Sequence, residues 1–185
     1  MKNLLLPLFI VFVFITSPLF NPAFAQVVSS DTSSVPVSAK VGQSCTISTS
    51  SAIAFGWYDP IEANATTPLN AIGLISVTCT KGSTGMTVGI GNGQHSGGTS
   101  TRYMVGTTTP SLLSYTIGQP SSNAAGALCT FPAAVPWSTT GAGLLSIVPS
   151  PDSVARVYSI CGTVPGGQSV PVDQYSDTII ATINF

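Results

Sequence analysis

The last eight residues of the chain read Thr178-Ile179-Ile180-Ala181-Thr182-Ile183-Asn184-Phe185. One set of alternate residues in this stretch is entirely apolar: Ile179, Ala181, Ile183 and Phe185. The intervening set is mostly polar, with Ile180 as its one apolar member. Successive side chains of a β-strand point to opposite faces of the sheet, so this period of two predicts a half-buried strand. We expect the apolar set to face a core.

Similar short runs recur along the chain from Val35, each bounded by Gly, Pro, Ser or Asn, and no segment shows a sustained helical period. The clearest runs cover residues 35–41, 72–79, 86–90, 102–105, 112–117, 144–148 and 154–160. A succession of short alternating runs separated by turn residues is typical of a β-sandwich. The sequence therefore predicts an all-β fold.

One edge of this sandwich is expected to be open. Immunoglobulin-type sandwiches need about seven strands, and the last one normally covers the groove beside its predecessor. If the strand that ends at Phe185 is the sixth, its edge is uncovered, which is an aggregation hazard. Near the other end of the chain, an alternating segment suits such a groove in another molecule: Val35, Val37, Ala39 and Val41. We therefore predict an incomplete immunoglobulin-like β-sandwich that is completed by a donor strand.

The N-terminus has the pattern of a secretory signal peptide. Lys2 is followed by an apolar run from Leu4 to Phe20, and then by the small-x-small sequence Ala23-Phe24-Ala25. A membrane anchor is the competing interpretation, but the run is shorter than the roughly 20 residues of a membrane span and contains two prolines. We expect a signal peptide over residues 1–25, an N-terminal extension with the donor strand over 26–43, and one domain over 44–185. No membrane insertion of the mature chain is expected.

The charge of the mature chain excludes several kinds of partner. Four basic side chains remain after residue 25, Lys40, Lys81, Arg102 and Arg156, against six acidic ones. Binding to nucleic acid or anionic lipid needs clustered Lys and Arg that neutralise several phosphates. We therefore expect no nucleic-acid partner, and a surface made polar mainly by Ser, Thr, Asn and Gln.

All four cysteines, Cys45, Cys79, Cys129 and Cys161, follow the predicted signal peptide. An even number of cysteines in an exported chain indicates two disulfides, and four cysteines allow three pairings. We favour Cys45 with Cys79 and Cys129 with Cys161, because each pair would join neighbouring predicted strands and close a loop of about 30 residues. The chain has no CxxC motif, which argues against redox catalysis and a zinc ribbon.

The residue types that could carry chemistry are isolated along the sequence. His95 is the only histidine and has no Cys, Asp or Glu near it in the chain, so we interpret it as a solvated loop residue. Asp59 and Asp177 stand beside strand ends, where capping and turn roles are expected. We predict no catalytic, cofactor-binding or metal-binding residue and no cofactor, hence no enzyme.

Three aromatic residues lie close together at Phe55, Trp57 and Tyr58. Such a group can form a platform on which a sugar ring stacks, or it can contribute to the core. We favour core packing, with at most one of the three exposed.

Five short motifs stand out between Val35 and Phe185. They are AFGWYDP at 54–60, GLISVTCT at 73–80, RYM at 102–104, VPGGQ at 164–168 and QYSDT at 174–178. In this order they resemble the FGxYdP, GxIxVxCT, RxM, PxGQ and YxDT motifs of the spore coat U domain family, which includes subunits of Csu-type archaic chaperone-usher pili. Two positions depart from the family pattern. Members of the family often have Gly before the YxDT motif, where this chain has Asp173-Gln174, and they often have Tyr near the position at which this chain has Cys129.

The resemblance implies a structural pilus subunit, shaft or adaptor, that is assembled by donor-strand exchange. A periplasmic chaperone would lend a strand to the edge formed by Ile179, Ala181, Ile183 and Phe185. At an outer-membrane usher, the segment with Val35, Val37, Ala39 and Val41 of another pilus subunit would replace that strand. The product would be a homo- or hetero-polymer on the cell surface that supports adhesion and biofilm formation. A spore-coat or surface-layer protein of the same fold is the alternative, followed by a secreted carbohydrate-binding module.

Overall fold

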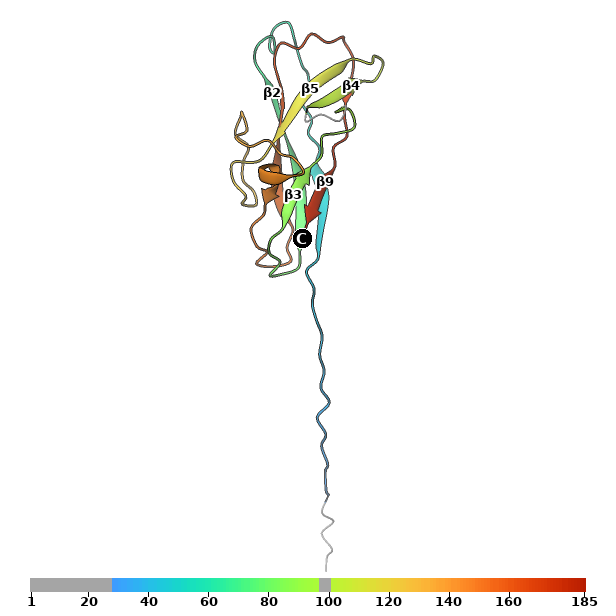
Figure 1. Cartoon of the computed structure of the whole chain (residues 1–185), viewed down its shortest axis with the longest axis vertical. Helices are drawn as coiled ribbons and strands as arrows, with labels where there is room; N and C mark the ends of the chain where they lie inside the picture. Colours follow the sequence, from blue (N-terminus) through green and yellow to red (C-terminus); the bar gives the residue numbers. More distant parts are fainter. Residues whose placement is uncertain (1–27, 97–100) are drawn as a thin grey trace, which may run out of the picture. The chain divides into compact units, whose positions relative to one another are not determined.

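The computed structural model describes residues 28–96 and 101–185, and the signal peptide predicted over residues 1–25 lies outside them. The described chain contains nine β-strands and one short 3-10 turn, η1 (Gly141–Gly143), so the all-β prediction is confirmed. All nine strands belong to one compact unit, Lys40–Phe185, and residues 28–39 lie outside it (Figure 1). None of the described residues forms a helix that is long and apolar enough to cross a membrane.

The larger sheet has six strands in the order β1-β2-β7-β5-β4-β8, and each neighbouring pair is antiparallel. Its strands are β1 (Cys45–Ser51), β2 (Leu69–Cys79), β4 (Arg102–Gly106), β5 (Leu112–Gly118), β7 (Arg156–Val164) and β8 (Tyr175–Ser176). The alternation of the sequence is visible in β2, where Ile75, Val77 and Cys79 are buried and the residues between them are partly exposed. This sheet therefore buries one face and leaves the other to solvent.

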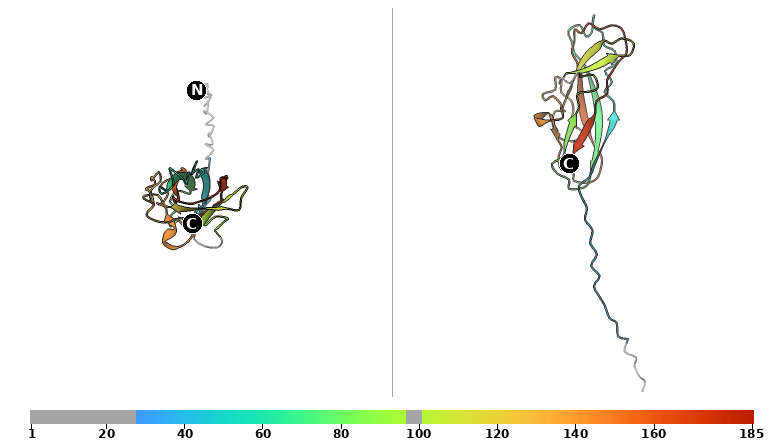
Figure 2. Two further views of the ribbon diagram at one scale, coloured as in Figure 1. Left: turned by 90° about the horizontal axis from the view of Figure 1, so that it is seen from above. Right: turned by 45° about the vertical axis from the view of Figure 1, so that its right-hand side comes forward.

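The smaller sheet has three strands in the order β6-β3-β9. They are β6 (Leu145–Ser146), β3 (Thr87–Ile90) and β9 (Ala181–Asn184). The last strand, β9, pairs antiparallel with β3, with Val88 opposite Ile183 and Ile90 opposite Ala181. Figures 1 and 2 show β9, in red, beside β3. The other side of β9 is an edge of this sheet.

The core is drawn from both sheets and from one loop. The largest fully buried side chains are those of Trp137, Tyr158, Ile75, Met86, Ile90 and Ile117. Trp137 lies outside the strands, and its indole Nε1 donates a hydrogen bond to the carbonyl oxygen of Val88 at 2.8 Å. This bond satisfies the polar atom of the buried ring, as a core tryptophan requires.

Both disulfides form in the favoured pairs, Cys45–Cys79 and Cys129–Cys161, which confirms that prediction. Cys45 and Cys79 stand directly opposite each other in the β1–β2 ladder. The second pair differs from the expectation in one respect, because Cys129 lies in the loop after β5 and not in a strand. The two bonds therefore tie an edge strand and a long loop to the centre of the sheet.

The segment before β1 is extended but is not a strand. Residues 28–44 are assigned no strand or helix, whereas the sequence predicted an alternating strand over 35–41. Alternation alone produces a strand only where a partner supplies backbone hydrogen bonds. Val37 is 94% exposed, and Val35 and Val41 are also exposed.

Candidate functional site: an open groove between two edge strands

Two edge strands border a gap in the sandwich. β1 is the first strand of the larger sheet, and β9 is an edge of the smaller one. The two strands lie near each other, yet the described residues show no ladder between them. One side of each strand therefore offers backbone N–H and C=O groups that no strand formed by residues 28–96 and 101–185 uses.

A cavity of about 350 Å³ occupies this gap. Its walls include Thr49 and Ser51 on one side, and Ile179 and Ala181 on the other. Its remaining lining includes core residues of five strands: Ile75, Ile90, Met104, Tyr115 and Ile160. The groove is thus an apolar channel that reaches the hydrophobic core.

Two glycines make room for one wall of the groove. A Cβ atom on Gly73 of β2 would lie 2.5 Å from the side chain of Ile53, and a Cβ on Gly162 of β7 would lie 2.8 Å from the same side chain. Cβ atoms essentially never make non-bonded contacts this short, so the chain after β1 lies this close to the sheet because these two positions lack side chains. Phe55 follows on the same segment, with its ring 6.2 Å from that of Tyr115 in an edge-to-face arrangement.

Residues 179–185, of which Ile179 and Ala181 line the cavity, show the predicted alternation for most of their length. Ile179, Ala181 and Ile183 are partly buried and pack against the core, and the residues between them are exposed. Phe185 departs from the expected face, because its side chain is 58% exposed and lies outside the core cluster.

A buried carboxylate, that of Asp177, is part of the lining of the groove. Asp177 accepts a hydrogen bond from the Tyr115 hydroxyl at 2.7 Å and another from the backbone N–H of Gln94 at 3.0 Å. His95 Nδ1 lies 3.0 Å from Oδ1 of the same carboxylate. His95 does lie in a loop and its side chain is 34% exposed, but it is not isolated, because Asp177 is its partner. The two residues are 82 positions apart, so nothing local in the sequence indicates the pair.

The electrostatics around Asp177 are those of a closed structural cluster. Burial raises the pKa of the Tyr115 phenol far above its usual value, and the hydrogen bond to Asp177 raises it further. Burial lowers the pKa of Arg102, whereas the nearby Tyr115 and Asp177 raise it. A His–Asp pair serves proton transfer in many enzymes, but the Asp177 side chain is only 2% exposed and its oxygens are already bonded. The cluster ties the loop at Gln94 to β5 and to the segment between β8 and β9.

Two of the three clustered aromatic residues are packed against the core and one is exposed, as the sequence predicted. Phe55 and Tyr58 pack against the core, whereas Trp57 is 86% exposed, which confirms that at most one is exposed. The Tyr58 hydroxyl donates to the carbonyl of Pro165 and accepts from the N–H of Gln168, which fixes this end of the molecule.

Asp59 has the turn role that the sequence predicted. Its carboxylate accepts hydrogen bonds from the backbone N–H groups of Ile61 and Glu62. These bonds lower the pKa of Asp59, the one from Ile61 most strongly. Within residues 28–96 and 101–185, no group of three or more His, Cys, Asp or Glu could hold a metal ion.

Comparisons with known proteins agree with the motifs. The model of the Spore Coat Protein U domain family matches residues 31–182. Protein U of Myxococcus xanthus is 32% identical over 177 residues, which cover 90% of this chain and 89% of that protein.

Among solved structures, the chain is similar to a chain of the CsuC-CsuE chaperone-tip adhesion subunit pre-assembly complex from archaic chaperone-usher Csu pili of Acinetobacter baumannii. The match to it has a TM-score of 0.45 and 17% identity. It covers 78% of this chain and only 40% of that one. The family match, which spans most of the chain and all five motifs, is the decisive finding: the chain belongs to the spore coat protein U domain family.

Proposed function

We propose that this chain is a structural subunit of a chaperone-usher surface pilus, assembled by donor-strand exchange and serving adhesion and biofilm formation. The observation that carries the proposal is the apolar groove between β1 and β9, neither of which has a second strand partner on that side. The exposed alternating segment with Val35, Val37, Ala39 and Val41 supplies a strand of the matching kind.

The physical logic of strand addition suits these features. An added strand gains ladder hydrogen bonds along an unpaired edge, and its alternate side chains fill pockets in the groove. Each valine that is transferred from water into the groove contributes on the order of 1.5 kcal/mol or more. Several such side chains together with the ladder bonds make a joint that lasts without covalent chemistry.

The proposal assigns partners and a route. A periplasmic chaperone binds the edge of β9 first, and an outer-membrane usher then exchanges the chaperone strand for the donor segment of another pilus subunit. Residues 26–43 serve as the N-terminal extension and residues 44–185 as the pilin-like domain. The mature chain is exported through the periplasm to the cell surface, and it acts as a building block and not as an enzyme.

A matched pair of substitutions tests the donor segment. Val37→Arg places a charge where the groove would have to desolvate it, and an unpaired buried charge is costly enough to prevent insertion or shift the register. Ser38→Arg places the same charge on the opposite side of the segment. We expect Val37→Arg to give a chaperone-bound subunit that forms no fibres, and Ser38→Arg to polymerise nearly as the unmodified chain does.

The measurement is fibre formation, followed by electron microscopy and sedimentation, after each variant is mixed with chaperone-bound wild-type subunit. If the two variants polymerise equally, residues 35–41 are not the donor strand, and the pilus proposal loses its main support.

A coat protein of the same fold is the second candidate, and the 32% identity to Protein U of Myxococcus xanthus favours it. Such a protein would use similar strands in a different assembly. Genes for a periplasmic chaperone and an outer-membrane usher beside the gene for this chain would favour the pilus. Their absence, together with recovery of the chain from spore coats, would favour the coat.

A further inference from the structure

One end of the sandwich carries an apolar surface beyond the groove, around a second cavity that shares Ile53, Phe55, Met104 and Tyr175 with it. Trp57, Ile61 and Val172 are 86%, 82% and 99% exposed, and all three line this second cavity of about 790 Å³. Exposed tryptophans that border a pocket are typical anchors of protein interfaces. The cavity lies between the segment at residues 53–61 and the loop at residues 170–175.

The same end is acidic. Asp59 and Asp173 line the cavity, and exposed Glu62 lies one residue after Ile61. None of the basic side chains in the described chain lines this cavity. We call this surface, made of Trp57, Ile61 and Val172 with Asp59, Glu62 and Asp173, the acidic pole.

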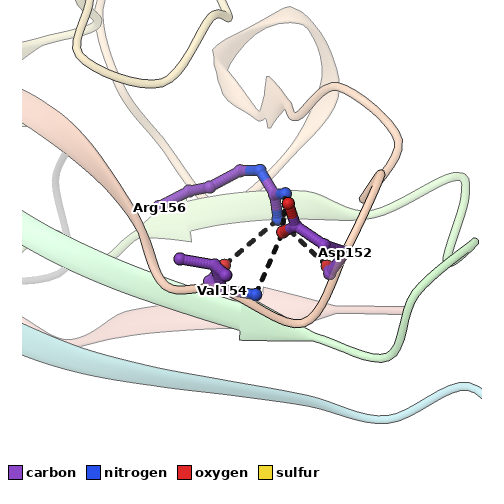
Figure 3. A network of polar contacts seen from close by, with 3 residues as sticks. All are labelled: Asp152, Val154 and Arg156. Carbon is purple, nitrogen blue, oxygen red and sulfur yellow. Dashed lines mark hydrogen bonds and ion pairs between the residues drawn. The ribbon is translucent and has the colours of Figure 1, made fainter.

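The opposite end of the sandwich is basic. Lys81 lies in the turn that follows Cys79, and Arg156 begins β7 opposite Val77. Arg156 is held by Asp152, whose Oδ1 lies 2.5 Å from its Nη2, and the same oxygen accepts the N–H of Val154 (Figure 3).

Lys40 is the first residue of the folded unit, three positions before Gln43, whose side chain bonds to Thr84 in the same region. Lys81 and Arg156, of which Arg156 is paired with Asp152, make up what we call the basic pole, and Lys40 belongs to the donor segment that leads into it.

Strand direction brings the two poles together in a polymer. The end of β1, at Thr49 and Ser51, and the start of β9, at Ala181, line the same cavity, so β1 and β9 run in opposite directions and a strand between them is antiparallel to one and parallel to the other. The donor strand of this inference is the one that is antiparallel to β9. A donor strand antiparallel to β9 has its C-terminal end near the start of β9, on the side of Tyr175 and the acidic pole. Only three residues, 42–44, then separate Val41 from Cys45, where β1 of the donor subunit begins at its own basic pole.

We infer that the acidic pole of one subunit is a docking surface for the basic pole of the next copy of this chain, with Trp57 as its anchor; this rests on the proposed donor-strand polymer. A contact between two different patches of the same chain is heterologous and extends into a filament. The opposite charges of the poles favour this orientation over pole-to-like-pole contacts. The contact sets the angle between subunits and supplements the strand joint.

Intrinsic fluorescence reads this contact directly, because the chain has two tryptophans, of which Trp137 is fully buried and Trp57 is exposed. In the chaperone-bound subunit, acrylamide should quench Trp57 readily. In fibres we expect several-fold weaker quenching of Trp57 and a blue-shifted emission, and Trp57→Phe should remove both changes. Fibres in which Trp57 stays as accessible as in the free subunit would overturn the inference.

A charge swap separates the pole contact from burial by the donor strand itself. Glu62→Lys and Lys81→Glu should each leave Trp57 more accessible in fibres, and the double variant should restore its protection. Val37→Arg prevents fibres, and in dilute solution, where subunits do not meet through their poles, this variant should leave Trp57 open to quenching. If Trp57 is protected in fibres to the same degree in all charge variants, the donor strand itself covers the ring, and this result also overturns the inference.

Two further outcomes keep this inference distinct from the proposed function. If no fibres form, the poles can still be tested with concentrated solutions of the subunit. Protection of Trp57 that depends on the charges of the poles would then support the docking surface without the pilus. Continued quenching of Trp57 would contradict both the docking surface and the pilus. If neutral oligosaccharides such as maltohexaose or chitohexaose protect Trp57 in the free subunit and the charge swap has no effect, the acidic pole is a glycan site and not a subunit contact.

Discussion

Arg102 is a buried cation that binds backbone carbonyl groups from separate parts of the chain. Its side chain is buried, and its guanidinium donates to three backbone carbonyls, those of Gly91, Ile90 and Trp137, at 2.9, 3.1 and 2.7 Å. These carbonyls belong to a loop, the end of β3 and the loop that contains the core tryptophan. A planar group with several fixed donors is needed to reach all three.

Arg102→Lys tests this geometry. The ammonium keeps the charge but cannot present the planar fork, so at least one buried carbonyl loses its partner. We expect the free energy of unfolding to fall by about 2–3 kcal/mol. Urea unfolding of the full chain provides the measurement, with Lys81→Arg as an exposed control that should change stability little. An unchanged midpoint for Arg102→Lys would contradict this account of the cluster.

Asp173 gives the fold a defined response to acid. Desolvation raises its pKa, but hydrogen bonds from the backbone N–H groups of Thr108 and Thr109 and the hydroxyls of Thr107 and Thr109 outweigh it and hold the pKa well below its usual value. A carboxylate with a lowered folded-state pKa stabilises fully above its unfolded pKa of about 4, and this stabilisation is lost as the pH falls through the folded value.

Asp173→Asn should therefore melt at a lower temperature than the unmodified chain at pH 7, and the difference should shrink steadily below about pH 4. Melting curves of both proteins from pH 7 to pH 2 supply the comparison. A difference in melting temperature that is constant over this range would assign the effect to the amide itself and not to ionisation.

At the scale of elements, β1 is held on one side only. It pairs with β2, and the Cys45–Cys79 bond closes a loop with a sequence separation of 34 at one end of this ladder. The strand is also a wall of the groove. The disulfide thus acts on both the stability of the fold and the shape of the candidate site.

Replacing Cys45 and Cys79 together by Ser should lower the yield of subunit in the periplasm and destabilise the domain by about 2–5 kcal/mol. Cys129→Ser with Cys161→Ser removes a bond of similar span from a loop, so it should leave uptake of the donor strand less affected. Subunit yield and melting temperature report the outcome. A variant without the Cys45–Cys79 bond that behaves as the unmodified chain would contradict this role.

For the molecule as a whole, the open edge at β9 should decide whether a chaperone holds the subunit. Deleting residues 182–185 removes most of β9, and with it the pairing to β3. We expect this deletion to abolish recovery of a chaperone complex in co-purification.

Truncation can also unfold the chain, so a matched pair separates the two effects. Ile183→Asp changes the core-facing side of β9 and should greatly reduce the chaperone complex, whereas Thr182→Asp changes the exposed side and should be mild. Normal recovery of the truncated subunit with its chaperone would rule out β9 as the contact.

The local pattern of the sequence predicted β2 to β7 and β9, the favoured disulfide pairs and the core-facing side of residues 179–183, but it did not predict β8. Alternation and turn residues act between neighbours in the chain, and strands follow from them directly. The five motifs in order likewise indicated the family. The sequence did not predict β1, because most residues of Cys45–Ser51 are polar and show no clear alternation of apolar and polar side chains.

Only the tertiary structure decided which distant residues meet. His95 and Asp177 are brought together by the topology across 82 positions, and Gly73 needs its missing side chain because Ile53 returns against it. The segment at Val37 alternates as a strand does, yet it forms none here. Its pattern is local, but the hydrogen bonds that make a strand come from a partner, and no strand of the described chain supplies them.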